Sequence, residues 1–408
     1  MRSPPIRAAL AKWTEHLEVI LKLAERCNIN CTYCYVFNGA DKSFERHPPS
    51  ISNDTVKNVA LFLRDACLTL KISALQIDFH GGEPLLVGKR RFDKICGILR
   101  DFLDPVTRFQ LAIQTNAILI DKDWISLFSN HRVSPGVSLD GPKDINDVFR
   151  LDFKRRSSYS DVQRGLSLLR NAFKEGLIDS LGILAVINPL FPAKRIYNHF
   201  VHELEIHTLD FLFPDLTHDS FLGTDDGTVG QFLCDVFDTW NEEDDPNVFV
   251  RVLTSVLALL LGGRSRMIGF GGELPAAISI ATDGTLGPDD TLRGCGEAFF
   301  CCDSNVRTTS LVDFLAQPVM LEVFDAGRTI PRVCKNCCWE LICRGGHLIH
   351  RFSTTERFRR ESVFCNSLKR LYSHIGNYLI EEGELTLDKL AGNLRLPGWQ
   401  TQSLQQLD

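Results

Sequence analysis

Apolar and polar residues along positions 16–240 predict strands and helices in alternation. Short apolar runs predict six strands, at Leu17–Ala24, Leu75–Phe79, Phe109–Gln114, Val133–Leu139, Leu181–Ile187 and Leu209–Phe213. Amphipathic segments with a helical period begin between these runs, near Asn53, Lys89, Asp121, Ser160 and Pro192. Ser52-Asn53 and Asp121 are suitable N-caps for the first and third of these helices. Strands that alternate with helices are typical of a parallel sheet with helical crossovers, so we expect an α/β fold.

Six strand–helix units are fewer than the eight of a closed barrel, so the pattern predicts an open, partial (β/α)6 TIM-like barrel. In such folds the chemistry lies at the C-terminal ends of the strands. Four segments follow predicted strands at those ends, namely residues 27–34, 80–84, 115–116 and 140–142. We therefore expect these segments to form one site.

The pattern changes in the second half of the chain. A helical period runs over residues 228–261 and stops at Gly262-Gly263, and Asp283-Gly284 predicts a hairpin turn. A loop-dominated, cysteine-rich stretch reaches residue 365, and a closing helix over about 367–382 precedes a polar tail. The expected organisation is an N-terminal extension (1–15), a partial barrel (16–240), a helical connector (241–277), a cysteine-rich domain (278–374) and a C-terminal tail (375–408).

Composition excludes several classes of protein. A chain of 408 residues favours more than one domain. The net charge of −6 argues against a general nucleic-acid binder, because binding phosphates needs a basic face. No apolar run reaches the roughly 18 residues that cross a bilayer, and the N-terminus lacks the apolar core of a signal peptide. We therefore expect a cytoplasmic protein with neither nucleic-acid nor membrane partners.

Cysteine is the unusual component of this chain. Fourteen cysteines in a cytoplasmic protein would rarely form disulfides, because that compartment keeps thiols reduced. Three lie between Cys27 and Cys34, and eight lie between Cys295 and Cys365. The three isolated ones, at 67, 96 and 234, lie in apolar helical patterns and are interpreted as small buried hydrophobic residues.

The first group has the spacing Cys27-x3-Cys31-x2-Cys34 directly after a predicted strand. Three thiolates on one loop can hold three corners of a four-iron, four-sulfur cluster. No fourth cysteine follows nearby, which would leave one iron with an open, catalytic position. The alternative is a zinc site or a redox cysteine cluster, although zinc would need a fourth ligand nearby.

This motif, with the aromatic Tyr33 before its third cysteine, resembles the signature of the radical S-adenosylmethionine (SAM) superfamily. The resemblance implies that the open iron binds the amino and carboxylate groups of SAM. It also implies that one electron releases a 5′-deoxyadenosyl radical, which abstracts hydrogen from a substrate.

A second segment resembles a SAM-binding element of the same superfamily, the GGEP loop. It comprises Gly81, Gly82, Glu83 and Pro84, which follow Phe79-His80. The resemblance implies that this loop receives the methionyl amino group of SAM. Glycines let the backbone approach closely, and an ionised Glu83 only accepts hydrogen bonds, which suits an ammonium group.

Later strand ends also resemble positions that contact the cofactor or line the substrate cavity. These are Thr115, Asn116, Ser138 and Asp140, for which ordinary turn chemistry is the alternative. Arg150 and Arg155 lie in a segment that approaches the cofactor carboxylate in relatives.

The second cysteine group has the spacing Cys334-x2-Cys337-x5-Cys343-x21-Cys365, which by itself fits zinc or iron–sulfur binding. Beside the first motif it resembles the SPASM extension, which carries auxiliary four-iron clusters. That resemblance implies that these four cysteines fully ligate one auxiliary cluster, with Cys338 as a non-ligand.

The chain departs from the seven-cysteine SPASM pattern. His347 stands where the pattern has its final cysteine. Cys295 corresponds to a first ligand of another auxiliary cluster, to which Cys301 or Cys302 could contribute. A second auxiliary cluster is therefore either absent or completed by an unusual ligand such as His347.

Three stretches, 209–219, 279–295 and 343–365, resemble the Xye- and FxsB-type peptide maturases, and the resemblance spans about 16–375. It implies a ribosomally made precursor peptide as substrate and a cross-link between an aromatic ring carbon and a side-chain β-carbon. Thioether formation, epimerisation and β-hydroxylation use similar machinery. A sulfatase-maturase-like enzyme that oxidises Cys or Ser is a further alternative, against which the missing seventh cysteine counts. The non-enzymatic alternative is a zinc-binding interaction protein.

A cross-linked product must lose one electron and one proton after the ring is attacked. The auxiliary cluster could take the electron, and Asp290 or Asp289 is the candidate base, with a solvated turn as the alternative. We also expect a flavodoxin- or ferredoxin-type electron donor. Because the first strand begins near residue 16, the precursor's leader would bind the barrel or C-terminal region directly, or be presented by a separate leader-binding protein.

Overall fold

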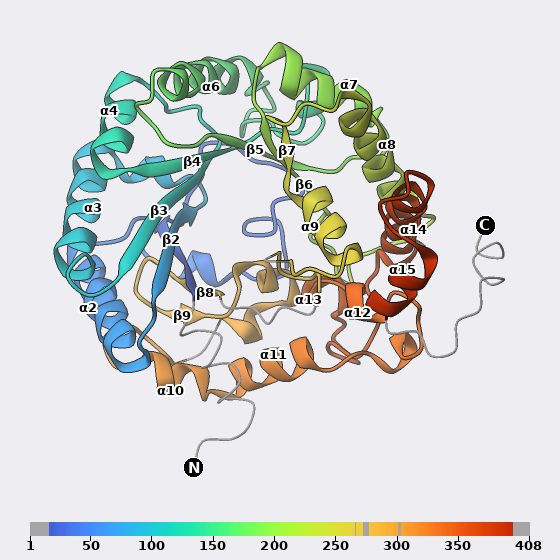
Figure 1. The fold of residues 1–408 in the computed structure, drawn as a ribbon. Helices are drawn as coiled ribbons and strands as arrows, with labels where there is room; N and C mark the ends of the chain where they lie inside the picture. Colours follow the sequence, from blue (N-terminus) through green and yellow to red (C-terminus); the bar gives the residue numbers. More distant parts are fainter. Residues whose placement is uncertain (1–15, 266, 272–276, 301–302, 395–408) are drawn as a thin grey trace. The chain divides into compact units, whose positions relative to one another are not determined.

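The computed structural model describes residues 16–265, 267–271, 277–300 and 303–394 (Figure 1). The expected extension over residues 1–15, Cys301, Cys302 and the tail from 395 onward lie outside the described residues. The chain groups into two compact units. The first comprises the described parts of residues 1–186, 199–208 and 275–325, and the second those of 187–198, 209–274 and 326–408.

The first unit is built on a sheet with the strand order β5-β4-β3-β2-β1-β8-β9. Its parallel strands are β1 (Leu17–Ala24), β2 (Ala74–Gly81), β3 (Arg108–Thr115), β4 (Val133–Ser138), β5 (Gly182–Val186) and β8 (Ala277–Ile280). The short β9 (Leu286–Gly287) pairs with β8 in an antiparallel hairpin, which confirms the turn predicted at Asp283-Gly284. The sheet confirms the expected α/β class with a parallel sheet.

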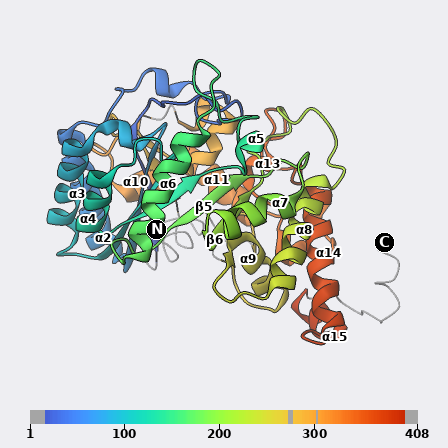
Figure 2. The same ribbon diagram turned by 90° about the horizontal axis from the view of Figure 1, so that it is seen from above.

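Helices connect the parallel strands of this unit. They are α2 (Asn53–Leu70), α3 (Lys89–Leu103), α4 (Lys122–His131), the short α5 (Lys143–Asn146) and α6 (Tyr159–Lys174). Figures 1 and 2 show α2, α3 and α4 side by side along the outside of the sheet. Ser52 accepts a hydrogen bond from Thr55 N (3.0 Å) and Asp121 accepts one from Trp124 N (3.1 Å), which confirms both predicted N-caps.

Aromatic side chains lock the sheet to these helices. Phe92 of α3 packs edge-to-face against Phe79 of β2, with ring centroids 5.3 Å apart, and against Trp124 and Phe128 of α4 at 5.2 and 5.8 Å. All four rings are buried, so they contribute a large apolar area to the core. Their packing holds the C-terminal end of β2, where the site begins, in a fixed position.

The second unit contains β6 (Thr208–Leu212, except Thr208 itself) and the neighbouring two-residue β7 (Phe249–Val250). Its principal helices are α7 (Ala193–Asn198), α8 (Thr228–Glu243), α9 (Arg251–Leu260), α14 (Cys365–Glu381) and α15 (Leu387–Asn393). The helical run expected over residues 228–261 is thus broken in two. The break contains Asp244 in a left-handed conformation (φ 45°) and Pro246, which cannot continue a helix.

The closing helix is confirmed as α14, whereas α15, capped by Thr386, was not predicted from the polar composition of the tail. The remaining short helices are α10 (Leu311–Leu315), α11 (Pro318–Arg328), α12 (Glu340–Cys343) and α13 (Leu348–Arg351). Short 3-10 helices include η2 (Pro84–Val87) and η4 (Asp290–Cys295).

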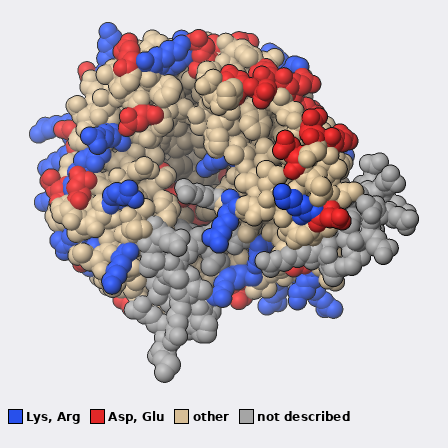
Figure 3. All heavy atoms as spheres, viewed as in Figure 1, with Lys and Arg blue, Asp and Glu red and all other residues tan. Residues whose placement is uncertain are grey.

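Two surface properties follow the composition. Among the helices of the described ranges, none has the length and apolar character that a membrane span requires. On the face drawn in Figure 3, acidic and basic side chains are both present over α2, α3 and α4 rather than sorted by sign. This part of the face therefore lacks the continuous basic stripe typical of nucleic-acid binding.

Candidate cofactor and substrate site

The first three cysteines lie on a loop that leaves β1 and is held by the segment after α5. Asn30 N donates to Leu151 O (2.8 Å) and Thr32 N donates to Phe149 O (3.1 Å). Burial raises the pKa of the Cys27 thiol to about 12, and the nearby Cys31 and Cys34 add to this effect. The pKa of Cys31 is raised as well, and thiols such as these two that resist ionisation are suited to a cationic partner, which stabilises the thiolate form. The donor set therefore fits an iron–sulfur cluster.

No group of three or more His, Cys, Asp or Glu side chains is arranged to hold one metal ion within the part of the chain that the structure describes. A tetrahedral zinc ion would bring its sulfur ligands to about 3.8 Å from one another, given Zn–S bonds of about 2.3 Å. A four-iron cube separates its thiolates more widely, because each binds a different iron atom. The iron–sulfur cluster on Cys27, Cys31 and Cys34 therefore stays a prediction.

The glycine loop after β2 packs against the chain that enters the cysteine loop. Gly82 N donates to Ala24 O (2.8 Å) and Glu83 N donates to Arg26 O (2.9 Å). A Cβ atom on Gly81 or Gly82 would overlap the same two carbonyl oxygens, and Gly81 has φ +145°. The two glycines therefore permit the GGEP loop and the segment leading to Cys27 to lie against each other.

Glu83 holds the ends of two strands together. Its buried carboxylate accepts hydrogen bonds from Leu85 N (3.1 Å), Thr115 Oγ1 (2.7 Å) and Asn116 N (2.9 Å). Burial raises the pKa of Glu83 to about 6 despite these donors. Asn116 Nδ2 also donates to Asn28 Oδ1 (2.7 Å), which connects β3 to the cysteine loop. The structure thus brings the predicted Glu83, Thr115 and Asn116 together.

Tyr33 of the cysteine loop forms a second cluster with Asp140, which follows β4, and Arg150, which follows α5. Tyr33 Oη donates to Asp140 Oδ2 (2.7 Å), and Arg150 donates to Tyr33 Oη (2.8 Å). Burial raises the pKa of Asp140, although Arg150 and the Tyr33 hydroxyl oppose the shift. Ser138 lies apart from this cluster and accepts a hydrogen bond from Gln114 Nε2 (2.7 Å).

Two buried polar groups beside this cluster have no hydrogen-bond partner among the described residues. They are the Nε of Arg150 and the whole side-chain amide of Asn146, which precedes Arg150 by one helical turn. Unpartnered buried donors are costly, and an N–H of a guanidinium is best satisfied by a carboxylate. This orphaned pair fits the amino-acid end of a bound SAM. Asn146, the last residue of α5, was not among the predicted site residues.

Arg155, the other arginine of the predicted segment, lies on an exposed turn with φ +59°. Its backbone N donates to Asp152 O (2.9 Å), and Asp152 also pairs with Arg156. The structure therefore distinguishes the buried Arg150 from Arg155.

A charged network begins at Lys22, which is fully buried near the C-terminal end of β1. Its Nζ forms an ion pair with Asp290, and lies 3.1 Å from His80 Nδ1. Tyr35 Oη donates to Asp290 Oδ2 (2.8 Å). Arg293 Nε donates to Asp290 Oδ1 (2.7 Å). Burial alone would raise the pKa of Asp290, but the two cations outweigh burial and hold it well below its usual range.

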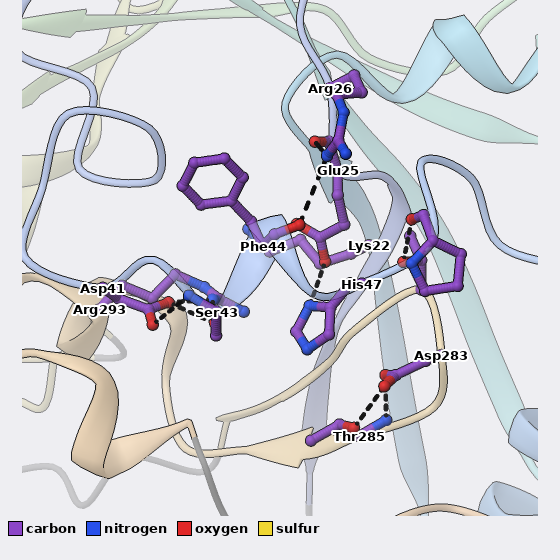
Figure 4. Close-up of polar contacts among 12 residues, drawn as sticks. Lys22, Glu25, Arg26, Asp41, Ser43, Phe44, His47, Asp283, Thr285 and Arg293 are labelled. Atoms are coloured by element: carbon purple, nitrogen blue, oxygen red, sulfur yellow. Dashed lines mark hydrogen bonds and ion pairs between the residues drawn. The ribbon is translucent and has the colours of Figure 1, made fainter.

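Arg293 extends the network to the loop after the cysteine motif. Figure 4 shows its guanidinium beside Asp41 (2.5 Å) and Ser43 (3.0 Å). In the same view His47 Nδ1 lies 3.3 Å from Glu25 Oε1. Sequence reasoning missed this network, although a lysine inside the apolar run LEVILKLA was an available indication.

The two candidate bases have different surroundings. Asp289 is the N-cap of η4, where its Oδ1 accepts hydrogen bonds from Thr291 N (2.9 Å) and Thr291 Oγ1 (2.5 Å). Asp290, by contrast, reaches Lys22, Tyr35 and Arg293. The structure therefore gives Asp289 a turn-forming role and places Asp290 within the charged network.

The second cysteine group lies in the second unit. Burial raises the pKa of Cys334 to about 11 and that of Cys343 to about 12, and in both cases the nearby Cys365 adds to the shift. Burial is the main cause that raises the pKa of Cys365, and the nearby Cys337 raises it further. The four predicted ligands therefore lie together. A hydrogen bond with Cys338 lowers the pKa of Cys337 to about 6. Cys295 ends η4 in the first unit.

Comparison with known proteins identifies the relatives of this arrangement. Residues 21–188 match the family model of the Radical SAM superfamily. The cysteine-type anaerobic sulfatase-maturating enzyme of Clostridium perfringens (strain 13 / Type A) is 26% identical over 377 residues, which are 88% of this chain and 96% of that protein. The serine-type enzyme of Bacteroides thetaiotaomicron is 23% identical over 400 residues, or 90% and 92% of the two chains.

Solved structures show the same fold. Native anSMEcpe with bound AdoMet and Cp18Cys peptide superposes with a TM-score of 0.76 and 22% identity, over 90% of this chain and 99% of that one. Streptococcus suis SuiB bound to S-adenosylmethionine superposes with a TM-score of 0.55 and 17% identity, over 88% and 78%. The two curated relatives are both named anaerobic sulfatase-maturating enzymes, the class of enzyme that the sequence analysis gave as an alternative. They do not specifically support the Xye and FxsB type.

Proposed function

We propose, on the premise that residues 21–188 carry a radical SAM core fold, that this chain is an oxidoreductase that modifies a peptide. In this proposal it removes a hydrogen atom from a ribosomally made precursor and joins an aromatic ring carbon to a side-chain β-carbon. One observation carries the radical chemistry. The loop of Cys27, Cys31 and Cys34, the GGEP loop and Arg150 converge at the ends of neighbouring parallel strands.

The residues of the first unit would divide the binding of the cofactors among them. Cys27, Cys31 and Cys34 would hold a four-iron cluster, and the loop of Gly81–Pro84 would receive the SAM amino group. Arg150, with its unpartnered Nε, would receive the SAM carboxylate. When bound and reduced, this pair of cofactors supplies a 5′-deoxyadenosyl radical that can break an unactivated C–H bond.

The charged network would complete the reaction at the substrate. Ring attack followed by loss of an electron leaves a strongly acidic proton on the ring, so even a weak base is able to take it. The ionised Asp290 is the proposed acceptor, since Asp289 is engaged in the turn of η4. The four cysteines of the second unit would hold an auxiliary cluster, which would supply an electron acceptor.

A second candidate function is the oxidation of a Cys or Ser residue in a protein substrate. The relatives that favour it are named cysteine-type and serine-type anaerobic sulfatase-maturating enzymes. It uses the same proposed cofactor site, so only the product distinguishes the two candidates.

The test uses protein purified and reconstituted without oxygen, then given SAM and dithionite in place of the flavodoxin- or ferredoxin-type donor. One arm adds a short precursor peptide encoded beside this chain, and the other adds a cysteine-containing peptide. Loss of two hydrogens with a fragmentation-resistant block supports the cross-link, whereas oxidation confined to cysteine supports the second candidate. An unchanged precursor, or one that gains an oxygen, contradicts the cross-link.

Two further observations bear on the wider proposal. Zinc rather than iron on the first cysteine group, or iron without SAM cleavage, would exclude radical chemistry. Co-purification of the precursor with this chain alone would show that no separate leader-binding protein is needed.

A further inference from the structure

His80 and Lys22 face each other across two neighbouring strands. They are register partners in the parallel pairing of β1 with β2, and Lys22 Nζ lies 3.1 Å from His80 Nδ1. Lys22 is fully buried, and its ammonium group is also paired with Asp290. Burial lowers the pKa of Lys22, and the ion pair with Asp290 opposes this shift. An ammonium group donates hydrogen bonds and accepts none, so with Lys22 as the cationic partner of Asp290 we assign Nδ1 of His80 as the acceptor. The ring proton of a neutral His80 therefore lies on Nε2.

The surroundings keep this imidazole neutral. Burial, Lys22 and Arg293 together lower the pKa of His80 to about 3, against the attraction of Asp290. The charged groups that face the ring are thus Lys22 from β1 and Asp290 and Arg293 from η4. Lys22 and Arg293 belong to a network in which the buried acids Asp41 and Asp290 balance their charge. The lowered pKa of His80 therefore does not depend on mobile surface charges.

The Nε2 edge of the ring has no polar partner among the described residues. The side chain of His80 is 26% exposed, and its only polar partners among the described residues are at Nδ1. His80 directly precedes Gly81, where the loop expected to receive SAM begins. The distance between His80 Nδ1 and Asp290 Oδ2 is 3.8 Å. His80 therefore belongs to the segment that leads into the proposed cofactor loop and also lies beside the proposed base.

We propose that His80 is a neutral hydrogen-bond donor for a backbone carbonyl of the substrate peptide, and that Lys22 is the positioning residue that fixes its tautomer. This inference rests on the proposed peptide-modifying function. An extended peptide presents one carbonyl oxygen per residue, and a neutral donor binds it without selecting for acidic side chains. A protonated imidazole would instead favour carboxylates.

The binding test compares three substitutions of one side chain. His80→Gln keeps an N–H donor at a similar reach, whereas His80→Asn is too short and His80→Leu has no donor. We expect His80→Leu and His80→Asn to weaken binding of the precursor peptide about 3- to 10-fold, the range for one lost hydrogen bond, and to raise KM more than they lower kcat. His80→Gln should restore most of the affinity. His131→Leu, on α4, is the matched control and should leave the affinity unchanged.

The tautomer test needs no substrate. In the reconstituted chain labelled with 15N-histidine, with His80→Gln used to assign the resonance, we expect a neutral Nε2–H imidazole from about pH 5 to 8. Lys22→Met should release the ring to a mixture of tautomers that titrates nearer the usual value of about 6.5. If that variant fails to fold, the wild-type spectrum alone still decides the tautomer.

The outcomes separate this inference from the proposed function. If wild-type protein modifies neither peptide, the peptide-modifying proposal fails first. If wild-type protein is active but His80→Leu binds the precursor with wild-type affinity, only the role of His80 is overturned. An imidazolium or an Nδ1–H tautomer at pH 7 would overturn the role of Lys22.

Discussion

The guanidinium group of Arg150 donates a hydrogen bond to the phenol oxygen of Tyr33, at 2.8 Å. Tyr33 lies between Cys31 and Cys34, so this contact ties the arginine to the loop that would carry the metal cluster. A site for the SAM carboxylate and the site of the cluster would therefore share one rigid frame. The following predictions test that frame and the network beside it.

Replacing Cys31 by Ala should remove iron from the first unit and abolish 5′-deoxyadenosine formation, because two thiolates cannot hold the cube that three would hold. Iron analysis and chromatography of the reaction with SAM and dithionite measure both effects. Cys67→Ala is the matched control, since this buried cysteine of α2 is interpreted as a hydrophobic residue. Retained SAM cleavage in Cys31→Ala would contradict the assignment of the motif.

Replacing Arg150 by Gln should weaken SAM binding about 10- to 100-fold, the cost of losing one charge-assisted hydrogen bond. Equilibrium binding to the reconstituted protein measures the change. Arg155→Ala should bind SAM as the wild type does, because Arg155 lies on an exposed turn. Equal losses in the two variants would show that Arg150 acts only through the general charge of the segment.

Replacing Cys343 by Ala should lower the iron content from about eight to about four atoms per chain, if the second group carries one closed four-iron cluster. Cys338→Ala, a few residues away, should leave the iron content unchanged because Cys338 is the predicted non-ligand. Cys295→Ala then reports on a further cluster. A loss of iron in Cys338→Ala would mean that the ligand set has been assigned incorrectly.

Replacing Asp290 by Asn should cost about 3–5 kcal/mol in the free energy of unfolding, because Lys22 would be left buried without its anion. Adding Lys22→Met should recover much of this loss, since Arg293 keeps Asp41 as a partner. Denaturant unfolding of the two single variants and the double variant gives the coupling between them. Asp289→Ala should lose only the cap of η4, about 1 kcal/mol. Additive effects would contradict the ion pair.

The buried Glu83 should make stability fall as pH rises. Its folded pKa of about 6 lies above the ordinary value of 4.5, so the folded state binds a proton more tightly than the unfolded chain. Between those two values the free energy of unfolding should therefore decrease, by about 2 kcal/mol in total. The difference in unfolding free energy between wild type and Glu83→Gln, measured at pH 4 and pH 7, isolates this contribution. A difference that does not change with pH would exclude it.

Much of the fold was predictable because periodicity is a local property of the chain. The predicted strand Leu17–Ala24 coincides with β1, and the helix expected near Asn53 begins there as α2. Predictions were weaker where local composition misleads. The tail looked uniformly polar, yet Thr386 caps α15, and Pro246 divides a helical pattern that otherwise continued.

The sequence by itself determined the strand–helix order, the two cysteine spacings and the placement of polar segments after strands, because each depends on neighbours in the chain. Only the tertiary structure decided that Asp290 meets Lys22 across 268 positions, and that Arg150, not Arg155, reaches Tyr33. Such pairs arise when parallel strands bring their C-terminal ends to one edge of a sheet, and buried charges must then find partners there. Spacing along the chain carries no record of which partner is found.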